Sequence, residues 1–369
     1  MTHNLSSPIL SRNFDWSKQL KYEGPQKIKE KRWKVQFPNT LSISKPVIDD
    51  RNTIIFGTNS GDMIWVDPDG HVIRTRSYGD GVMSSSMIND DGNLLVALSS
   101  GNQDNHLMEL SPTGEILWKC PIDSSFRFEP VLNNNGQLYG ATRNELIKFD
   151  SRGHVLWRFA CLNISCCPIL DLQGNVHFTS RSDNGVYISL SEDGLLRWKK
   201  EMGKCFIDHA PIIDSHGNIY MLIADSESLH SLYSFDSEGN TNWVYALQDR
   251  GIISSPALSD TGCIVMGTTY FKLISLNLDG QLIWESDLGH TTQFTPILDR
   301  QSNIYLYTYE KKRKTSSHLW RLNDQGNVCW KHKMDNAIQW FSFNQENGFL
   351  TLSVDSDTFL LELTSYAYE

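Results

Sequence analysis

Apolar and polar residues alternate in short runs along most of this chain, and turn residues separate the runs. The clearest example lies between Ser255 and Trp284. It predicts three short strands and the start of a fourth, which begin at Pro256, Cys263, Phe271 and Leu282. Asp-Thr-Gly and Asp-Gly turns separate these runs, so the stretch predicts a small antiparallel sheet.

This unit recurs along the chain. A turn that ends in glycine is followed four residues later by tryptophan at Gly114/Trp118, Gly153/Trp157, Gly194/Trp198, Gly239/Trp243, Gly280/Trp284 and Gly326/Trp330. Gly70 has Arg74 in the tryptophan position. The seven glycines are 44, 39, 41, 45, 41 and 46 residues apart. A period in the low forties with four strands per unit is typical of a β-propeller.

A second marker opens the first strand of each unit. It is proline at Pro46, Pro130, Pro168, Pro211, Pro256 and Pro296, with Ser86 in the second unit and Phe341 near the start of the last. The last unit ends without a glycine–tryptophan turn, whereas Trp33, Val35 and Phe37 form an isolated strand pattern near the start. We therefore predict an all-β, eight-bladed propeller whose last blade is closed by the N-terminal strand, with seven blades as the alternative.

The recurring tryptophans have two possible roles. Each lies on the outermost predicted strand of its blade, where it could pack against the next blade or form a row of sugar-binding rings. Because a buried tryptophan removes a large apolar area from water, we expect the tryptophans to pack between blades.

The repeat resembles that of a known family. The segment L-I-S-L-N-L-D-G-Q-L-I-W at residues 273–284 is similar to the pyrroloquinoline-quinone-like propeller repeat, which occurs in quinoprotein dehydrogenases and outer-membrane assembly lipoproteins. The resemblance covers about residues 33–363. It implies an eight-bladed frame. The chain lacks room for the large inter-blade insertions of quinoproteins, and its first cysteine is Cys120, so we expect no lipobox and no cofactor.

Charge is unevenly distributed along the 369 residues. The formal net charge is −10, yet residues 1–40 carry more basic than acidic groups. We predict an irregular basic arm over residues 1–30 and a single propeller domain over residues 31–369. The acidic balance argues against a nucleic-acid partner, which favours a basic surface.

The first residues and the cysteines bear on location. We expect no secretory signal, because no basic start is followed by an apolar run, and no membrane span, because no apolar stretch approaches the ~18 residues required. The seven cysteines form no C-x-x-C pair, which favours free thiols in a reducing compartment. The expectation is a cytoplasmic monomer.

Candidate chemistry lies in the loops that precede the first strands. In a propeller these loops gather on one face around the central channel, together with the loops between second and third strands. Arg127, Glu129, Asp208 and His209 belong to the third and fifth predicted blades and could face one another there. A histidine beside a carboxylate suits general acid–base chemistry, although loops are polar in any protein. No spacing of histidines and acids predicts a metal site.

Two other features have simpler explanations. Cys166-Cys167 is reminiscent of the vicinal cystine of quinoprotein dehydrogenases, but the pair runs directly into Pro168 at a strand start. We expect two buried thiols. The basic run at residues 311–314 is interpreted as a solvated turn.

Three functions are compatible with the sequence. The first is a binding or scaffold module that presents the loop face to a protein partner or a small ligand. The second is an enzyme (a lyase, cyclase or sugar-directed hydrolase) with His209, Asp208, Glu129 and Arg127 as its acid–base site. A quinone-dependent dehydrogenase ranks last.

Overall fold

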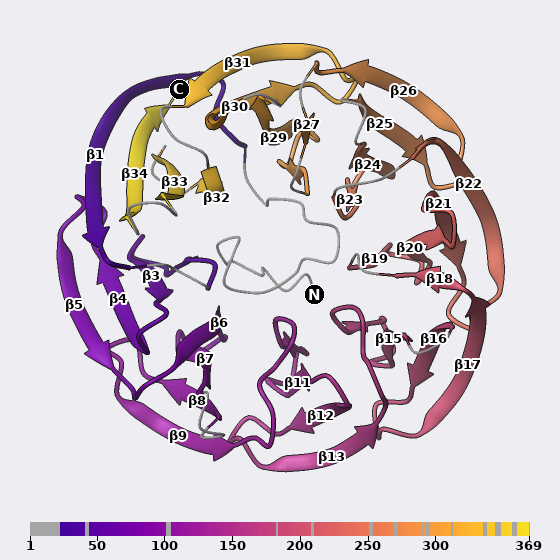
Figure 1. Ribbon diagram of the computed structural model, residues 1–369, viewed down its shortest axis with the longest axis horizontal. Coiled ribbons are helices and arrows are strands. Elements are labelled where there is room, and N and C mark those ends of the chain that lie inside the picture. Colours follow the sequence, from indigo (N-terminus) through magenta and orange to yellow (C-terminus); the bar gives the residue numbers. More distant parts are fainter. Residues whose placement is uncertain are drawn as a thin grey trace, which may run out of the picture.

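The chain folds into a ring of eight antiparallel sheets around a common centre (Figure 1). The computed structural model describes residues 23–40, 44–100, 105–181, 184–207, 210–250, 254–268, 272–289, 291–292, 295–310, 313–334, 338–343, 348–355 and 360–368. Strands, turns and connecting loops make up these ranges, and no helix in them is long and apolar enough to cross a membrane. The predicted eight-bladed propeller is confirmed, and the seven-bladed alternative is wrong.

The first four blades have four strands each. Blade 1 contains β2 (Val47–Ile48), β3 (Ile54–Gly57), β4 (Asp62–Val66) and β5 (Val72–Ser77). Blade 2 contains β6 (Val82–Ile88), β7 (Leu94–Ser99), β8 (His106–Leu110) and β9 (Ile116–Pro121). Blade 3 contains β10 (Val131–Leu132), β11 (Leu138–Ala141), β12 (Glu145–Phe149) and β13 (Val155–Ala160). Blade 4 contains β14 (Ile169–Leu170), β15 (Val176–Arg181), β16 (Gly185–Leu190) and β17 (Leu196–Gly203).

Blades 5 and 7 each add one short strand to the same plan. Blade 5 contains β18 (Cys205–Phe206), β19 (Ile212–Ile213), β20 (Ile219–Asp225), β21 (Leu229–Phe235) and β22 (Thr241–Arg250). Blade 6 contains β23 (Ala257–Leu258), β24 (Cys263–Gly267), β25 (Lys272–Asn277) and β26 (Leu282–Asp287). Blade 7 contains β27 (Thr291–Thr292), β28 (Ile297–Leu298), β29 (Ile304–Glu310), β30 (Arg313–Leu322) and β31 (Val328–Met334).

Blade 8 joins the two ends of the described chain. It contains β32 (Ile338–Phe343), β33 (Gly348–Asp355), β34 (Leu360–Tyr368) and, as its outer strand, β1 (Ile28–Pro38). The indigo β1 lies beside the yellow β34 in Figure 1, with Val35 opposite Leu363. The predicted closure is therefore confirmed. Strand β1 begins at Ile28, inside the range that sequence analysis assigned to the arm, and the preceding Gly24 donates its N–H to Asp299 of blade 7.

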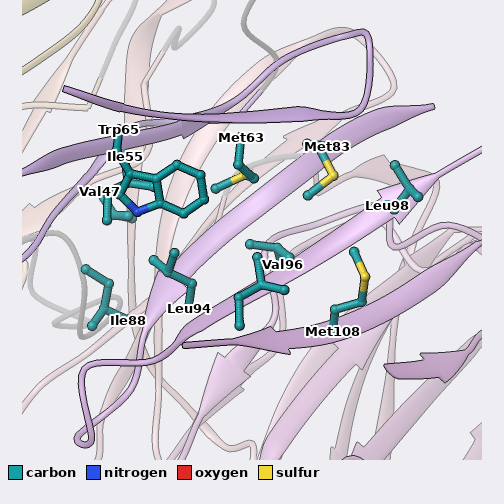
Figure 2. Close-up of a cluster of buried hydrophobic side chains, with 11 residues drawn as sticks. Val47, Ile55, Met63, Trp65, Met83, Ile88, Leu94, Val96, Leu98 and Met108 are labelled. Atoms are coloured by element: carbon teal, nitrogen blue, oxygen red, sulfur yellow. The ribbon is translucent and has the colours of Figure 1, made fainter. Parts of the chain in front are cut away.

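The core is divided among the contacts between blades. Within the described residues, eight clusters of buried apolar side chains occur, one at each interface. Inner strands serve two interfaces at once because successive side chains point to opposite faces of a sheet. On β4, Met63 and Trp65 face blade 2, as Figure 2 shows, whereas Ile64 packs in the cluster shared with blade 8. Outer strands such as β13 alternate between exposed and half-buried positions.

The outer-strand tryptophans join neighbouring blades, as predicted. Trp157 on β13 packs against Gly194 of blade 4 and donates its Nε1–H to the Glu192 carbonyl at 3.0 Å. A Cβ on Gly194 would lie 2.6 Å from the indole ring, so a larger residue would displace the tryptophan. The same contact joins Trp33 to Gly70, Trp198 to Gly239, Trp243 to Gly280 and Trp284 to Gly326. These rings are therefore structural.

Between blades 1 and 2, other side chains replace the missing tryptophan contact. Blade 1 has Arg74 where the other blades have tryptophan, and the glycine that it should meet is Gly114 of blade 2. The Tyr78 hydroxyl and the Trp65 ring lie against Gly114 instead. Tyr78 also donates to the Gly114 carbonyl at 2.6 Å. Blades 1 and 2 are thus joined without the recurring tryptophan.

Blades 1–7 each turn twice on the same side of the ring, which we call the turn face. At most of these turns, an Asp or Asn side chain three residues before the turn's end accepts two backbone N–H groups. Asp150, for example, accepts from Arg152 and His154 at 2.9 and 2.8 Å. The same pair of bonds occurs at Asp49, Asp67, Asn89, Asn133, Asp171, Asp214, Asp236, Asn277, Asp299 and Asn323. Such side-chain turns explain the regular geometry of this face.

Candidate functional site

The opposite side of the ring, the loop face, contains the connections between blades and the loops between second and third strands. Because consecutive strands are antiparallel, these segments lie at the other ends of the strands from the turns. Backbone hydrogen bonds hold two of the connections above blade 3. The Arg127 N–H donates to the Ala141 carbonyl and the Ile164 N–H donates to the Arg143 carbonyl, both at 2.9 Å. The connections on either side of blade 3 are therefore held to its own strands and loops.

An ion pair on this face joins two blades that are not neighbours. Lys45 immediately precedes Pro46 and blade 1, and Glu129 immediately precedes Pro130 and blade 3. The Lys45 Nζ lies 3.0 Å from the Glu129 Oε1, with the two side chains 63% and 31% exposed. The Glu129 charge raises the pKa of the Lys45 amine above its ordinary value. The pair therefore joins the connections that precede blades 1 and 3.

The cysteine pair lies next to this bridge. Cys166 and Cys167 are free and buried, at 1% and 7% exposure, which confirms the expectation of two buried thiols. The Cys167 thiol donates to the Glu129 carbonyl at 3.4 Å and packs in the apolar cluster between blades 3 and 4. Cys167 therefore helps to hold the backbone of Glu129 in place.

A hollow of about 450 Å³ lies above blade 3. Ser124, Ser125 and Arg127 line it from the connection between blades 2 and 3, and Arg143 lines it from the loop between β11 and β12. All four residues are exposed. The Arg143 Nε–H donates to the Asn163 side-chain oxygen at 3.0 Å, so this guanidinium is oriented by the next connection.

Acidic side chains near the hollow are held by other cations. Arg158 on β13 lies 3.2 Å from Asp123 and 2.8 Å from Glu145, and Glu129 is paired with Lys45. In the described ranges, Arg127 and Arg143 form no ion pair of their own. The hollow therefore presents two guanidinium groups and two hydroxyls to solvent.

The predicted site residues are divided by the structure. Arg127 and Glu129 lie on the loop face as expected, but Arg127 borders the hollow whereas Glu129 reaches Lys45. Asp208 and His209 lie outside the described residues, as do Lys311 and Lys312, so their placement stays a prediction. In the described part of the chain, no cluster of three or more His, Cys, Asp or Glu side chains could hold a metal ion.

Sequence reasoning missed four of the residues that form this region: Lys45 as the partner of Glu129, and Ser124, Ser125 and Arg143 around the hollow. One clue was available, because Lys45-Pro46 and Glu129-Pro130 place opposite charges at equivalent positions of two blades. No comparable clue marked the hollow, whose residues come from a connection and a loop 16 or more positions apart.

A second polar cluster lies within blade 4 and has no access to solvent. Nε2 of His177 lies 3.2 Å from the Asp171 carboxylate, and Nδ1 of His177 lies 3.2 Å from the Tyr187 hydroxyl. Burial raises the pKa of Tyr187 and by itself would also raise that of Asp171, but hydrogen bonds from His177 and Asn175 outweigh it and lower the Asp171 pKa. All three side chains are buried, so this cluster stabilises the blade.

Comparisons with known proteins agree with this architecture. The family model described as outer membrane protein assembly factor BamB matches residues 103–217. No curated protein matches the chain in sequence. BamB from Moraxella catarrhalis has a similar structure, with a TM-score of 0.64 at 16% identity, covering 92% of this chain and 99% of that one.

Two further solved structures share the fold. A europium-containing methanol dehydrogenase has a TM-score of 0.68 at 11% identity and covers 97% of this chain and 98% of its own. The C-terminal WD40 domain of Sif2 has a TM-score of 0.69 at 12% identity and covers 93% and 99%. The protein is thus an eight-bladed β-propeller. Its resemblance to the pyrroloquinoline-quinone-like repeat is confirmed, and these low identities show the fold alone.

Proposed function

We propose that the protein is a binding scaffold that holds a protein partner on its loop face. The observation that supports this proposal is the open hollow above blade 3, whose lining side chains are all exposed. A site for a small substrate normally encloses most of it in a mainly apolar pocket. An exposed, charged surface with an arginine-rich depression is better suited to another macromolecule, since arginine is enriched at protein interfaces.

The contacts of Glu129 also favour a binding scaffold over an enzyme. Its carboxylate is paired with Lys45, 3.0 Å away, and its backbone carbonyl accepts the Cys167 thiol. These contacts direct the Glu129 carboxylate toward Lys45. A general acid or base needs its carboxyl group directed at a substrate, which Glu129 does not provide while it is paired with Lys45. An acid–base role would therefore have to come from Asp208 and His209.

The matching family adds an analogy. The model that matches residues 103–217 is described as an outer membrane protein assembly factor, and we infer that this chain also acts through protein contacts. The analogy extends to the scaffold role and to no particular partner, because one fold hosts many activities.

We further propose a reducing compartment, such as the cytoplasm. All seven cysteines are free thiols, and Cys166, Cys167 and Cys205 are buried, as is usual where disulfides do not form. Titration of the denatured, unreduced protein with a thiol reagent should count seven thiols. A count of five would reveal a disulfide and contradict the proposal.

Two exposed leucines of nearly equal exposure test the scaffold role. Leu162 (69% exposed) lies on the loop face, in the connection between blades 3 and 4, and Leu172 (66% exposed) lies on the turn face. A photo-crosslinking amino acid placed at either position in living cells should report what lies against that face. We expect a discrete protein adduct from position 162 and none from 172, with the same adduct reproduced using the purified partner.

The converse results would contradict the proposal. Adducts of equal yield from both positions would show that the loop face is not the binding surface. A complete lack of discrete adducts at position 162, with the full-length protein folded, would mean that no protein is held there.

A further inference from the structure

We propose that the hollow above blade 3 is a binding site for a phosphate monoester group. Binding of the phosphate group itself does not depend on the proposed scaffold function. Only the idea that a protein partner carries the phosphate rests on that function. The site comprises the hydroxyls of Ser124 and Ser125 and the guanidinium groups of Arg127 and Arg143. None of these four residues was assigned a shared role by sequence analysis.

The donors in the hollow match the acceptors of a phosphate. Arginine carries its N–H groups in a planar fork that binds oxyanions through two parallel hydrogen bonds, and each serine adds an O–H donor. A phosphate monoester offers three terminal oxygens and a charge of about −1.5 to −2 at neutral pH. A carboxylate offers two oxygens and a single charge, so one arginine would satisfy it. Two arginines with two hydroxyls therefore favour phosphate.

The side chains around the hollow leave its two arginines available to bind an anion. Arg158 binds Asp123 and Glu145, and Lys45 binds Glu129, so the neighbouring carboxylates are engaged by other cations. Arg143 is oriented by its bond to Asn163. Arg127 lies 5.6 Å from the centre of the Phe128 ring, which gives its side chain an aromatic support.

The backbone beneath the hollow is fixed. Arg127 N–H bonds to the Ala141 carbonyl on β11, and Ile164 N–H bonds to the carbonyl of Arg143 itself. Phe126 is buried and lies directly against Gly140, where an added Cβ would be 2.4 Å from the ring. The two arginines thus start from anchored positions, and little backbone ordering is needed when an anion binds.

The same blade offers matched controls. Ser151 and Arg152 are exposed neighbours on the turn between β12 and β13, on the opposite face of blade 3. Changing Arg152 removes one exposed positive charge from the same blade without touching the hollow. Any effect that depends on net charge alone will therefore appear equally in Arg152→Gln and Arg127→Gln.

The experiment measures binding to the purified full-length protein by calorimetry or by NMR of a phosphorus probe. The probes are inorganic phosphate, a phosphoserine peptide, a phosphorylated sugar and acetate. We expect the phosphate compounds to bind more tightly than acetate, and binding to weaken as salt is added. Arg127→Gln or Arg143→Gln should weaken phosphate binding at least about tenfold, the loss expected for a charged hydrogen bond, whereas Arg152→Gln should leave it unchanged.

Comparison of the probes distinguishes the possible carriers. Tighter binding of the phosphoserine peptide than of inorganic phosphate would identify a phosphorylated protein segment, and tighter binding of the phosphorylated sugar would identify a small metabolite. Arg143→Lys keeps the charge but loses the fork, so it should restore only part of the affinity.

Several outcomes would overturn the inference. They are equal affinity for acetate and phosphate, equal loss in Arg152→Gln and Arg127→Gln, or no measurable binding of any phosphate probe by the folded protein. Failure here would leave the cross-link from position 162 intact, and failure of that cross-link would leave binding of the small phosphate probes intact, so the two proposals can fail separately.

Discussion

The turn face and the loop face are the two sides of the same eight blades, yet they follow different rules. On the turn face, most blades repeat the side-chain-capped turn and the glycine that receives a neighbour's tryptophan. On the loop face, each connection differs from the next in length and chemistry. Among the described residues, a charge pair between non-neighbouring blades occurs only there, between Lys45 and Glu129.

This difference separates the residues that build the ring from those that can act on a ligand. A repeated contact stabilises each interface in the same way and can be lost at one place if other side chains replace it, as Trp65 and Tyr78 do beside Gly114. An arrangement that occurs once, such as the two arginines that line the hollow, adds little to the stability of the ring. The comparison therefore predicts large stability effects on one face and small ones on the other.

Removal of the closing strand should have the largest effect. A variant that begins at Thr40 lacks β1 and leaves β34 unpaired along its outer edge. It also exposes the apolar cluster between blades 8 and 1 that Trp33 and Phe37 cover. We expect loss of cooperative thermal unfolding or aggregation, measured by calorimetry and light scattering. Native-like melting of this variant would contradict the importance of closure.

Loss of a recurring tryptophan should be the next largest effect. Trp198 packs against Gly239 and donates to the Ser237 carbonyl at 3.2 Å. Trp198→Ala should lower the free energy of unfolding by about 3 kcal/mol, the low end for a large aromatic because the ring is only half-buried. Leu195→Ala, at a 70% exposed position nearby, should change it by less than about 0.5 kcal/mol. Urea unfolding measures both, and equal effects would contradict the interface role.

The buried carboxylate of blade 4 should make stability depend on pH. The folded-state pKa of Asp171 is lowered by its hydrogen bonds, so this group stabilises the folded protein above its unfolded pKa, near ~3.9. That contribution is lost as the pH falls through the lower folded-state pKa. Asp171→Asn should therefore lower stability at neutral pH by about 1–3 kcal/mol and flatten the loss below pH ~4.

The control for this prediction lies on the same blade. Asp193 is exposed on the turn between β16 and β17, and Asp193→Asn should change the free energy of unfolding by less than about 0.5 kcal/mol at any pH. Urea unfolding at pH 7 and pH 3 provides the comparison. An unchanged pH profile in Asp171→Asn would show that Asp171 does not carry the acid sensitivity.

The charge pair of the loop face should have the smallest effect on stability. Lys45 is 63% exposed, so solvent screens the interaction, and Glu129→Gln should cost less than about 1 kcal/mol. A double-mutant cycle with Lys45→Gln isolates the coupling between the two side chains. A coupling comparable to the loss in Trp198→Ala would mean that the loop face also holds the ring together, and the distinction between the faces would fail.

The sequence predicted the ring in detail because repetition supplies many copies of the same evidence. Glycine and tryptophan at a constant spacing located six of the inter-blade contacts, and one strand pattern without its own unit located the closure at Trp33–Phe37. The sequence analysis did not predict the role of the polar residue three positions before the turn glycine, such as Asp150 before Gly153. That pattern occurs in each of blades 1–7, so the sequence alone could have revealed it.

The loop face was less predictable for a physical reason. Its contacts join segments that differ from blade to blade, so no second copy supports any one of them. Arg127 and Glu129 were placed on the correct face, but their partners Arg143 and Lys45 are set by the lengths and paths of separate connections. The short strands β18 and β27 were missed because two-residue pairings leave almost no periodic pattern.

The closure of blade 8 has a consequence for how the chain is made. Strand β1 leaves the ribosome well before its partner β34 is synthesised, because the contacting residues Gln36 and Glu362 are 326 positions apart. At typical synthesis rates this delay is roughly 20–60 seconds. During that time β1 has an unpaired edge, and the first blade has no neighbour on one side. We expect this interval, rather than the folding of any single blade, to be when the nascent chain is most exposed to misassembly and most dependent on chaperones.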